Sequence, residues 1–264
     1  MASRPVFFPV LSGAPGVKIE MVSFQWLPGI APSQKRKNVV TLHQAMQTAF
    51  GGHTPLEVSS KSPVAWGVRL SAFSLGIEST RSRGFVCVEA LYQCSKVFAD
   101  AGPFPQGYAL PAMEARELVK PHAAKPVKAF DLHGVRWPIT PSRAFYDWIY
   151  CQALHRNPEL VAELSGFTCF TDIEFNPTRS INCQAYAVAL YQSLVACGQL
   201  QKALASQADF LSIHPRESVC LEPRRKTPRG ARRVPARKPS RPRRGPAPQP
   251  APLTLFEQAM PSQE

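Results

Sequence analysis

The stretch NCQAYAVALYQSLVACG, residues 182–198, is the part of this 264-residue chain that most strongly predicts its own structure. It is apolar on most sides of a helix, Asn182 stands at its start and Gly198 closes it. A helix that is apolar nearly all round is buried, and glycine is common just past a helix end. We therefore expect a helix here that lies in the core.

Two carboxylates precede this helix, in FTDIEFNPTRSI at residues 170–181. If the segment is extended, Asp172 and Glu174 point to opposite sides, so only one of them can face a site. Apolar residues flank Asp172 and Asn176–Pro177 breaks the chain after it, so Asp172 is expected at a buried turn and Glu174 in solvent. A turn carboxylate and a site residue fit this pattern about equally well.

Asn182 stands where the unpaired N–H groups and the positive dipole end of the buried helix attract an anion such as phosphate. Asparagine is also an ordinary N-cap residue at such a position. The sequence leaves both roles open.

The rest of the chain mixes strands and helices without strict βαβ alternation, which predicts an α+β or irregular α/β fold. Residues 105–126 have weak periodicity and are expected to form an excursion from the core. The other predicted elements are a strand at 17–26, a helix capped by Ser33 and running to about Ala49, strands at 56–60 and 64–75, a helix from about Cys87, a hairpin turning at His133–Gly134, a helix at 141–155 and a short helix opening at Pro158.

On the helix from Cys87, Glu89, Gln93 and Lys96 fall at positions i, i+4 and i+7 and form a polar stripe beside the apolar face. The stripe would line one edge of a cleft. A solvated helix face with a surface ion pair explains the same spacing, although the apolar neighbours leave this helix little room to be exposed.

Weaker candidates are hydroxyls and a lysine near predicted strand ends, which suit a phosphate but also suit turns. They are Ser59 and Lys61 in SSKS (59–62), and Ser71 with Phe73 in LSAF (70–73). The aromatic residues of 145–150 could stack on a base, but aromatic side chains at helical spacing usually belong to the core.

The basic charge gathers at the C-terminus. The chain has a formal net charge of +13, but eleven of its 31 basic residues and three of its 18 acidic ones lie in 222–264, a segment rich in proline. We expect a folded domain over 1–221 and a disordered tail over 222–264. Basic residues that would contact DNA phosphates are Lys35, Arg36, Lys37, Arg224, Arg225, Arg232 and Arg233. The alternatives for the tail are a solubility or linker segment, or an arm for RNA or another acidic partner.

Several site classes lack their usual motifs. The seven cysteines are scattered and never spaced as CxxC, which argues against disulfides and zinc and favours a reducing compartment. No two of the six histidines are four residues apart and no HExxH is present, so no metal is expected. Walker, GxSxG and GxGxxG patterns are also missing, so nucleotide-triphosphate and serine-hydrolase sites lose their usual support. No apolar run approaches the length of a membrane span, and we expect a cytoplasmic protein.

Taken in order, SSKS, LSAF, VEALYQCSKVF, RAFYDWIYCQAL and FTDIEFNPTRSINCQA resemble the NADAR family over nearly all of residues 3–195. The likeness is to the branch encoded beside DarT-type toxins, which ADP-ribosylate guanine in DNA. Glu89, Tyr92, Gln93 and Lys96 match the family's Glu-helix. Ala72 replaces the asparagine of the family's Leu-Ser-Asn-Phe.

The resemblance implies an antitoxin-type hydrolase that removes ADP-ribose from guanine in DNA without a cofactor, with a DarT-type toxin as a possible partner and ADP-ribose as product. Glu89 and Asp172 would face one hollow at the ribose, Glu89 near the anomeric carbon and Asp172 as second carboxylate or ribose-hydroxyl ligand, although either could stabilise the cationic sugar. The other carboxylate or Lys96 would protonate the departing amine, and Lys96 could instead hold the diphosphate or keep Glu89 ionised. The implied substrate-binding residues are Ser59, Lys61, Ser71, Phe73, Gln93, Asn176 and Asn182. The alternatives are an N-glycosidase of a small nucleotide-like metabolite and a non-enzymatic protein that binds nucleic acid or the toxin.

Overall fold

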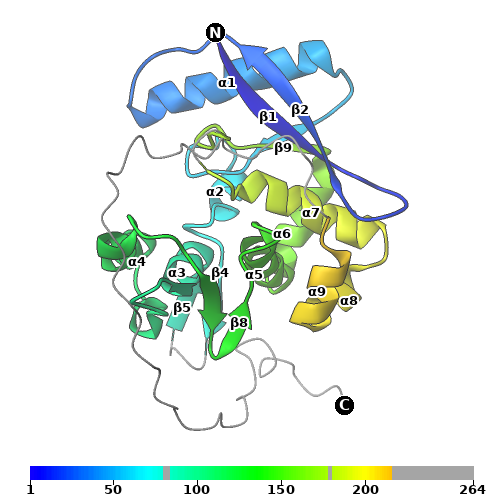
Figure 1. Ribbon diagram of the computed structural model, residues 1–264. Helices are drawn as coiled ribbons and strands as arrows, with labels where there is room; N and C mark the ends of the chain where they lie inside the picture. Colours follow the sequence, from blue (N-terminus) through cyan, green and yellow to red (C-terminus); the bar gives the residue numbers. More distant parts are fainter. Residues whose placement is uncertain (80–83, 178–179, 216–264) are drawn as a thin grey trace, which may run out of the picture.

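The computed structural model describes residues 1–79, 84–177 and 180–215 (Figure 1). The predicted tail, with Arg224, Arg225, Arg232 and Arg233, lies outside the described residues. The predicted boundary between 221 and 222 therefore stays a prediction.

Strands of the described residues form one sheet of four and two smaller sheets. The strands are β1 (Ala2–Pro9), β2 (Val17–Phe24), β3 (Pro55–Glu57), β4 (Gly76–Ser79), β5 (Gly84–Cys87), β6 (Lys96–Val97), β7 (Ala129–Leu132), β8 (Val135–Trp137) and β9 (Cys169–Thr171).

Helices surround these sheets in the described part of the chain (Figure 1). The α-helices are α1 (Pro32–Ala49), α2 (Ala65–Arg69), α3 (Val88–Cys94), α4 (Ala112–Val119), α5 (Ala144–His155), α6 (Pro158–Glu163), α7 (Gln184–Ala196), α8 (Leu200–Ala205) and α9 (Gln207–Ile213). The short 3-10 helices are η1 (Pro105–Gly107), η2 (Lys120–His122) and η3 (Leu164–Gly166).

The larger sheet has the order β2-β1-β9-β3, in which β9 is antiparallel to β1 and parallel to β3. The two smaller sheets are the pair β4-β5 and the meander β6-β7-β8. Mixed pairing of this kind, with helices packed around it, confirms the predicted α+β class.

Side-chain alternation along β1 buries both faces of this sheet. Val6 and Phe8 join the apolar cluster beneath α1, whereas Phe7 joins the cluster that contains α7. Along β9, Cys169 belongs to the first cluster and Phe170 to the second. Successive residues of a strand face opposite sides, so the sheet lies between α1 and the rest of the protein (Figure 1).

Helix α7 confirms the prediction from which the sequence analysis began. Residues Ala185 to Leu194 are buried except Gln192, and the helix packs against β1, β9 and α5. Gly198 follows it with a φ of 65°, a conformation that glycine adopts without steric cost.

Several other predicted elements are confirmed within a few residues. The strand at 17–26 is β2, the helix at 141–155 is α5, and α6 begins at Pro158. The predicted hairpin is β7–β8, where His133 and Gly134 have φ values of 53° and 89°. Two consecutive positive φ values match the tight turn that hairpins prefer.

The predicted strand at 64–75 is wrong, because the segment contains helix α2 followed by turns. Its apolar residues alternate as in a strand, but a run this short does not distinguish the two structures. Trp66 and Arg69 stack in a cation–π contact at 5.2 Å across the single helical turn. Gly67 lies so close to β3 that a Cβ there would be 2.0 Å from the carbonyl oxygen of Glu57.

Three smaller expectations are also corrected. Helix α3 ends at Cys94, so Lys96 lies in β6 rather than on the helix. Helix α1 has Ala31 as its N-cap and Pro32 in its first turn, where proline's missing N–H costs nothing, so Ser33 is not the cap. The weakly periodic residues 105–126 contain η1, α4 and η2.

No helix among the described residues is both long and apolar enough to cross a membrane. The six described cysteines are all free thiols, and five of them are buried. The predicted cytoplasmic location stays a prediction.

Candidate active site

A cavity of about 540 Å³, here called cavity A, opens between α3, α4, β7, α5 and the segment before α7. Its size falls within the range of small-molecule sites. Four of the residues predicted from sequence line it: Glu89, Gln93, Lys96 and Asn182.

Two backbone hydrogen bonds hold Glu89 and the preceding Val88 at the start of α3. Its N–H donates to the carbonyl oxygen of Ala72 (2.9 Å), and the N–H of Val88 donates to that of Leu75 (2.9 Å). Ala72 of the LSAF segment and Leu75 just after it therefore fix the first turn of α3. The side chain of Glu89 is 7% exposed although it lines a cavity.

Two donors converge on one oxygen of this carboxylate. Gln93 Nε2 donates to Glu89 Oε1 (2.8 Å), and Arg116 Nε forms an ion pair with the same atom (3.1 Å). Among the described residues, no hydrogen bond or ion pair is found for the other oxygen, Oε2. The arrangement orients the carboxylate while its other oxygen can meet a ligand.

Lys96 reaches the same group from β6. Its Nζ donates to Gln93 Oε1 (2.5 Å) and lies 4.7 Å from the centre of the Tyr92 ring. Burial lowers the pKa of Lys96 to about 8, which the charge of Glu89 opposes and that of Arg116 assists. An amine with a pKa near neutrality can give and take a proton under ordinary conditions.

Asn182 and Tyr92 meet on the wall of cavity A. Burial and the charge of Glu89 raise the pKa of the Tyr92 phenol, and a hydrogen bond with the Asn182 side chain offsets part of this rise. Within the described residues the Asn182 Oδ1 atom is buried without a hydrogen-bond partner. An unsatisfied buried acceptor is costly, so a ligand donor is a reasonable partner for it.

Asn182 is not the N-cap of α7, because that position is Cys183. The helix entrance is instead tied to the LSAF segment, since Gln184 Oε1 accepts a hydrogen bond from the N–H of Ala72 (2.8 Å). One backbone segment thus positions both Glu89 and the start of α7.

Arg116 is a site residue that the sequence analysis missed. It lies on α4, lines cavity A, pairs with Glu89 and stacks its guanidinium 5.5 Å from the centre of the Phe73 ring. Helix α4 was not predicted from the sequence, because the periodicity of residues 105–126 is weak. The available signal was a single arginine among acidic residues in MEARE, 113–117.

Asp172 occupies a buried turn, and Glu174 is exposed, as the alternation predicted. Asp172 Oδ1 accepts hydrogen bonds from the N–H groups of Glu174 (3.0 Å) and Phe175 (3.1 Å). Asp172 is not among the residues that line cavity A. The charges of Glu89 and Asp172 both act on the pKa of Tyr146, which lines the cavity and which burial raises most.

Another buried carboxylate, Glu57, was also missed by the sequence analysis. Its Oε1 accepts from Ser59 Oγ (2.6 Å) and from the N–H of Ile173 (2.8 Å), and its Oε2 accepts from Thr171 Oγ1 (2.7 Å). In the sequence analysis, Glu57 fell in a predicted strand at 56–60 and was assigned no role. Both faces of this sheet are covered, so a residue on either face is buried.

Glu57 and Asp172 influence each other. Burial raises the pKa of both carboxyl groups, and the charge of Glu57 helps to raise that of Asp172 to about 8. Thr171 donates its hydroxyl proton to Glu57, so His43 Nε2 must donate in its 2.8 Å contact with Thr171 Oγ1. Burial lowers the pKa of His43 to about 4, in keeping with a neutral ring.

The other predicted substrate ligands do not line cavity A. Ser59 is buried against Glu57, Lys61 Nζ donates to Ser60 Oγ (2.8 Å), and the carbonyl oxygen of Asn176 accepts from the N–H of Ser180 (2.9 Å). Ser71 is buried in the LSAF turn, and Phe73 is 39% exposed beneath Arg116. Their roles remain predictions.

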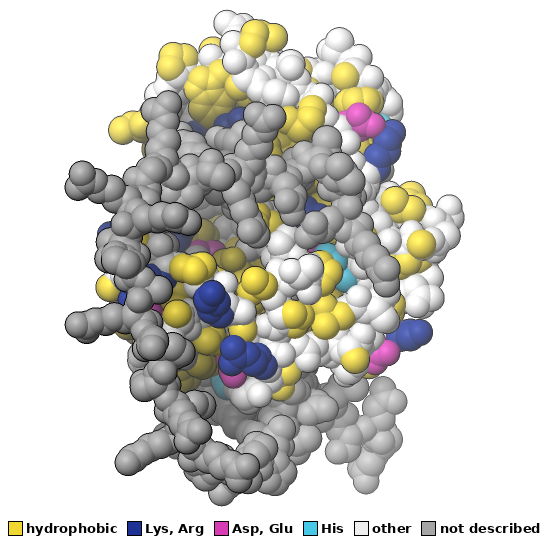
Figure 2. Space-filling view, in the orientation of Figure 1, with side chains coloured by type: hydrophobic (Ala, Val, Ile, Leu, Met, Phe, Trp, Pro, Cys, Tyr) yellow, Lys and Arg dark blue, Asp and Glu magenta, His cyan; other side chains and the backbone are white. Residues whose placement is uncertain are grey.

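The predicted nucleic-acid residues of the folded part lie on α1. Lys35 pairs with Glu174 (3.2 Å) and stands 5.3 Å from the centre of the Trp26 ring, whereas Arg36 and Lys37 are exposed. On the described surface in Figure 2, Lys and Arg side chains occur in small groups among apolar and uncharged ones. The described residues contain no group of three potential metal ligands.

The model of the DarT1-associated NADAR antitoxins matches residues 2–222 of the chain. The chain belongs to this NADAR antitoxin family. Membership supports an antitoxin role associated with a DarT toxin. No curated protein matches the sequence.

The match to the DarT1-associated NADAR antitoxins includes every element of the described fold. Three of the segments quoted for the NADAR resemblance meet in space, because Ala72 of LSAF bonds to Glu89 at the start of α3 and to Gln184 at the start of α7. Only part of the predicted NADAR site, the Glu-helix with Asn182, lines cavity A.

Proposed function

We propose that this antitoxin hydrolyses the N-glycosidic bond between ADP-ribose and guanine in DNA, and so reverses a DarT-type toxin. The observation that carries the proposal is the set Glu89, Lys96, Arg116 and Asn182 on the wall of one cavity. The set combines a carboxylate, two cations and an amide, which are the groups that a negatively charged glycoside requires.

The reaction breaks the bond from the anomeric carbon of the ribose to the exocyclic nitrogen of guanine. Positive charge develops on the sugar as this bond lengthens, and Glu89, placed beside the anomeric carbon, stabilises that charge. Water adds to the carbon while Glu89 takes one of its protons. The products are ADP-ribose and unmodified guanine.

The departing guanine nitrogen needs a proton, and Lys96 in its ammonium form can supply it. A pKa of about 8 keeps most of the Lys96 side chain protonated at pH 7 while making it a stronger acid than an ordinary lysine. Lys96 can then recover a proton from Glu89 through Gln93 or a water molecule, which restores the starting state. Arg116 orients the Glu89 carboxylate by its direct ion pair.

A purified guanine-ADP-ribosylated oligonucleotide tests the proposal directly. Wild-type protein should release free ADP-ribose, measured by mass spectrometry. Glu89→Gln should lower kcat by about 10²- to 10⁴-fold, the usual effect of losing an acid–base group. Glu114→Gln is the matched control, because Glu114 is an exposed glutamate on α4 that does not line cavity A.

Two results would contradict the proposal. If wild type leaves the adduct intact yet binds the toxin or DNA, the protein acts as a binder. If it cleaves ADP-ribosyl guanosine nucleotide or another small N-glycoside far faster than the oligonucleotide, the substrate is a metabolite rather than DNA.

A further inference from the structure

The described residues that line cavity A form a charged side and an uncharged side. The formally charged residues, Glu89, Lys96 and Arg116, come from α3, β6 and α4. The segments before and at the start of α5 and before α7 contribute hydroxyl, amide, aromatic and aliphatic side chains, namely Ile139, Ser142, Tyr146, Ser180, Ile181 and Asn182. Because α5 and α7 pack against each other, the loops that precede them both reach this cavity.

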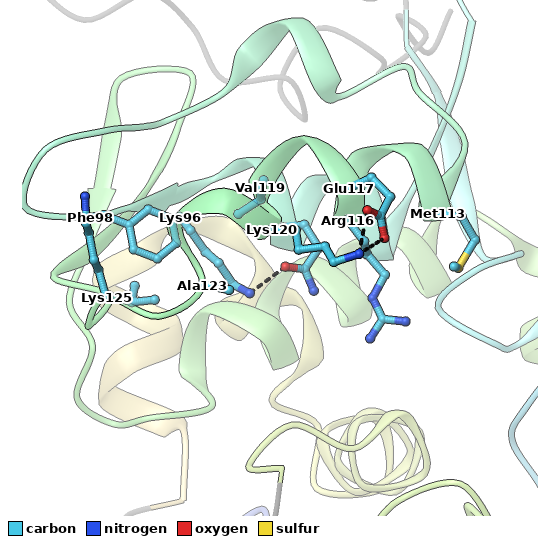
Figure 3. A pocket seen from close by; sticks show the side chains of 11 residues that line it. Lys96, Phe98, Met113, Arg116, Glu117, Val119, Lys120, Ala123 and Lys125 are labelled. Carbon is cyan, nitrogen blue, oxygen red and sulfur yellow. Dashed lines mark hydrogen bonds and ion pairs between the residues drawn. The ribbon is translucent and has the colours of Figure 1, made fainter. Parts of the chain in front are cut away.

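On its charged side, cavity A adjoins a second cavity of about 340 Å³, with which it shares Lys96 and Arg116. Figure 3 shows both cations in this second cavity, together with two further lysines. Neither Ile139 nor Ile181 lines the second cavity. The cations around Glu89 are therefore concentrated away from the two isoleucines.

The uncharged side extends from a buried floor to an exposed rim. Phe130 and Tyr146 are each 6% exposed, whereas Ile139 is 44% and Ile181 is 40% exposed. Glu89, at 7%, belongs to the buried end. Two large aliphatic side chains thus lie at the rim of the cavity that holds the reactive carboxylate.

The backbone constrains both isoleucines. Ile139 lies in the segment 138–141, which begins and ends with proline, and proline fixes its own φ. Beside Ile181, the Ser180 hydroxyl donates to the carbonyl oxygen of Asn182 (3.2 Å), which closes a turn around the isoleucine. A side chain that is already held in place loses little freedom when it contacts a ligand.

The proposed reaction requires an apolar contact at such a rim. A guanine in DNA must leave the base stack before its glycosidic bond can reach Glu89. Unstacking is costly, because it exposes the apolar faces of the two neighbouring bases to water, and proteins that unstack bases insert aliphatic side chains at the step. A rim with aliphatic and hydroxyl side chains fits base faces, whereas phosphates require cations.

We propose that Ile139 and Ile181 contact the bases on either side of the modified guanine and replace the stacking that these bases lose when the guanine enters cavity A. This inference rests on the proposed function. The two isoleucines are positioning residues, because they touch neighbouring bases and not the reacting atoms. Their contact distinguishes a nucleotide within a DNA strand from a free nucleotide, which has no neighbouring bases.

Three forms of one guanine-ADP-ribosylated substrate test the contact. The first is an oligonucleotide, the second is the same oligonucleotide with an abasic site on each side of the modified guanine, and the third is the modified mononucleotide. The abasic form keeps every phosphate and lacks only the neighbouring bases. Calorimetry measures binding to the full chain that carries Glu89→Gln, which prevents consumption of the substrate.

The test variant adds Ile139→Ser and Ile181→Ser to this parent chain. The matched control adds Leu11→Ser and Val195→Ser instead, which removes two exposed aliphatic side chains that do not line cavity A. All four positions are exposed, so the core is left intact.

The parent chain should bind the abasic form about tenfold more weakly than the ordinary oligonucleotide, the effect of losing a stacked base. The test variant should bind the ordinary oligonucleotide about tenfold more weakly than the parent does and should no longer distinguish it from the abasic form. Binding of the mononucleotide should be unchanged. The salt dependence should also be unchanged, because isoleucine neutralises no phosphate. The control should behave as the parent.

Three results would overturn the contact: equal binding of both oligonucleotides by the parent, a continued preference for the ordinary one in the test variant, or an equal loss for the mononucleotide. Because binding needs no turnover, a wild-type chain that leaves the adduct intact contradicts the proposed function without deciding this comparison.

A second variant covers the possibility that serine alters the shape of the rim. Ile139→Phe keeps an apolar side chain and adds a flat ring that stacks on a base. It should bind the ordinary oligonucleotide at least as tightly as the parent and keep the preference over the abasic form. A loss equal to that of Ile139→Ser would also overturn the proposal.

Discussion

Glu57 and Glu89 are both buried glutamates, 1% and 7% exposed, yet their surroundings differ in kind. Glu57 lies in the larger sheet and accepts hydrogen bonds on both oxygens from two hydroxyls and a backbone N–H. Glu89 lies at the wall of cavity A and contacts an arginine and a glutamine, both through one oxygen.

The difference separates a carboxylate that holds structure from one that can act on a ligand. One donor to Glu57, Ser59, is two residues away, and the other two, Thr171 and Ile173, come from a single segment far along the chain, so this residue connects β3 to β9 and to the turn at Asp172. The partners of Glu89 are two side chains next to a cavity that Lys96, a second cation, also lines. A reacting group needs both an accessible oxygen and a nearby proton donor.

The strongest test of this difference is to remove Glu57, the structural glutamate. Glu57→Ala should destabilise the fold by about 3 kcal/mol or more, because it leaves the buried N–H of Ile173 and two hydroxyls without their acceptor. Urea unfolding followed by circular dichroism measures this. The same measurement on Glu89→Gln should show a change below about 1 kcal/mol.

The hydrolysis rate per folded molecule of Glu57→Ala should stay near that of wild type. A rate loss as large as that of Glu89→Gln, without loss of stability, would show that Glu57 acts in the reaction rather than in holding the fold. Glu114→Ala, at an exposed position of α4, controls for the general effect of losing a negative charge.

The pH dependence of the hydrolysis rate tests whether Lys96 is the proton donor beside Glu89. The pKa of Lys96 is lowered to about 8, so its ammonium form is lost as the pH rises through 8. If that form donates the proton, kcat/KM should fall about tenfold for each unit above pH 8. Lys96→Arg should react more slowly at pH 7 but lack this alkaline limb, since arginine stays charged.

A rise of the wild-type kcat/KM through pH 8 would show instead that the neutral amine of Lys96 is the working form. A pH–rate profile of wild type and Lys96→Arg on one oligonucleotide substrate distinguishes the two outcomes.

A smaller effect on catalysis than at Glu89 or Lys96 is expected at Asp172. Its folded-state pKa of about 8 exceeds its ordinary value of 3.8, mainly because of burial and secondarily because of Glu57. Between these values the folded protein binds more protons than the unfolded chain, so stability falls as pH rises from about 4 to 8. Asp172→Asn keeps an acceptor for the two turn N–H groups and should remove part of this slope, measured by unfolding at several pH values.

The kcat of Asp172→Asn should change by less than about tenfold, because Asp172 does not line cavity A. A loss of about 100-fold or more would restore Asp172 as the second reacting carboxylate, which is the role that the sequence predicted for it.

Local pattern was sufficient for the elements whose periodicity is long or whose turn residues are specific. Helix α7, strand β2 and the hairpin at His133–Gly134 were predicted for this reason. The sequence pattern predicted a strand at α2, because the apolar residues of this single helical turn alternate as in a strand. No element was predicted at β1, whose sequence contains two prolines.

For the site, local spacing was enough to place Glu89, Gln93 and Lys96 together, since four residues make one helical turn and the lysine follows closely in β6. Spacing could not pair Arg116 with Glu89 or bury Glu57 beneath Thr171, because these contacts join segments that are distant in the chain. Which carboxylate borders a cavity depends on how those segments pack against one another. The sequence alone therefore predicted the kinds of group at the site, and long-range packing determined which of them meet.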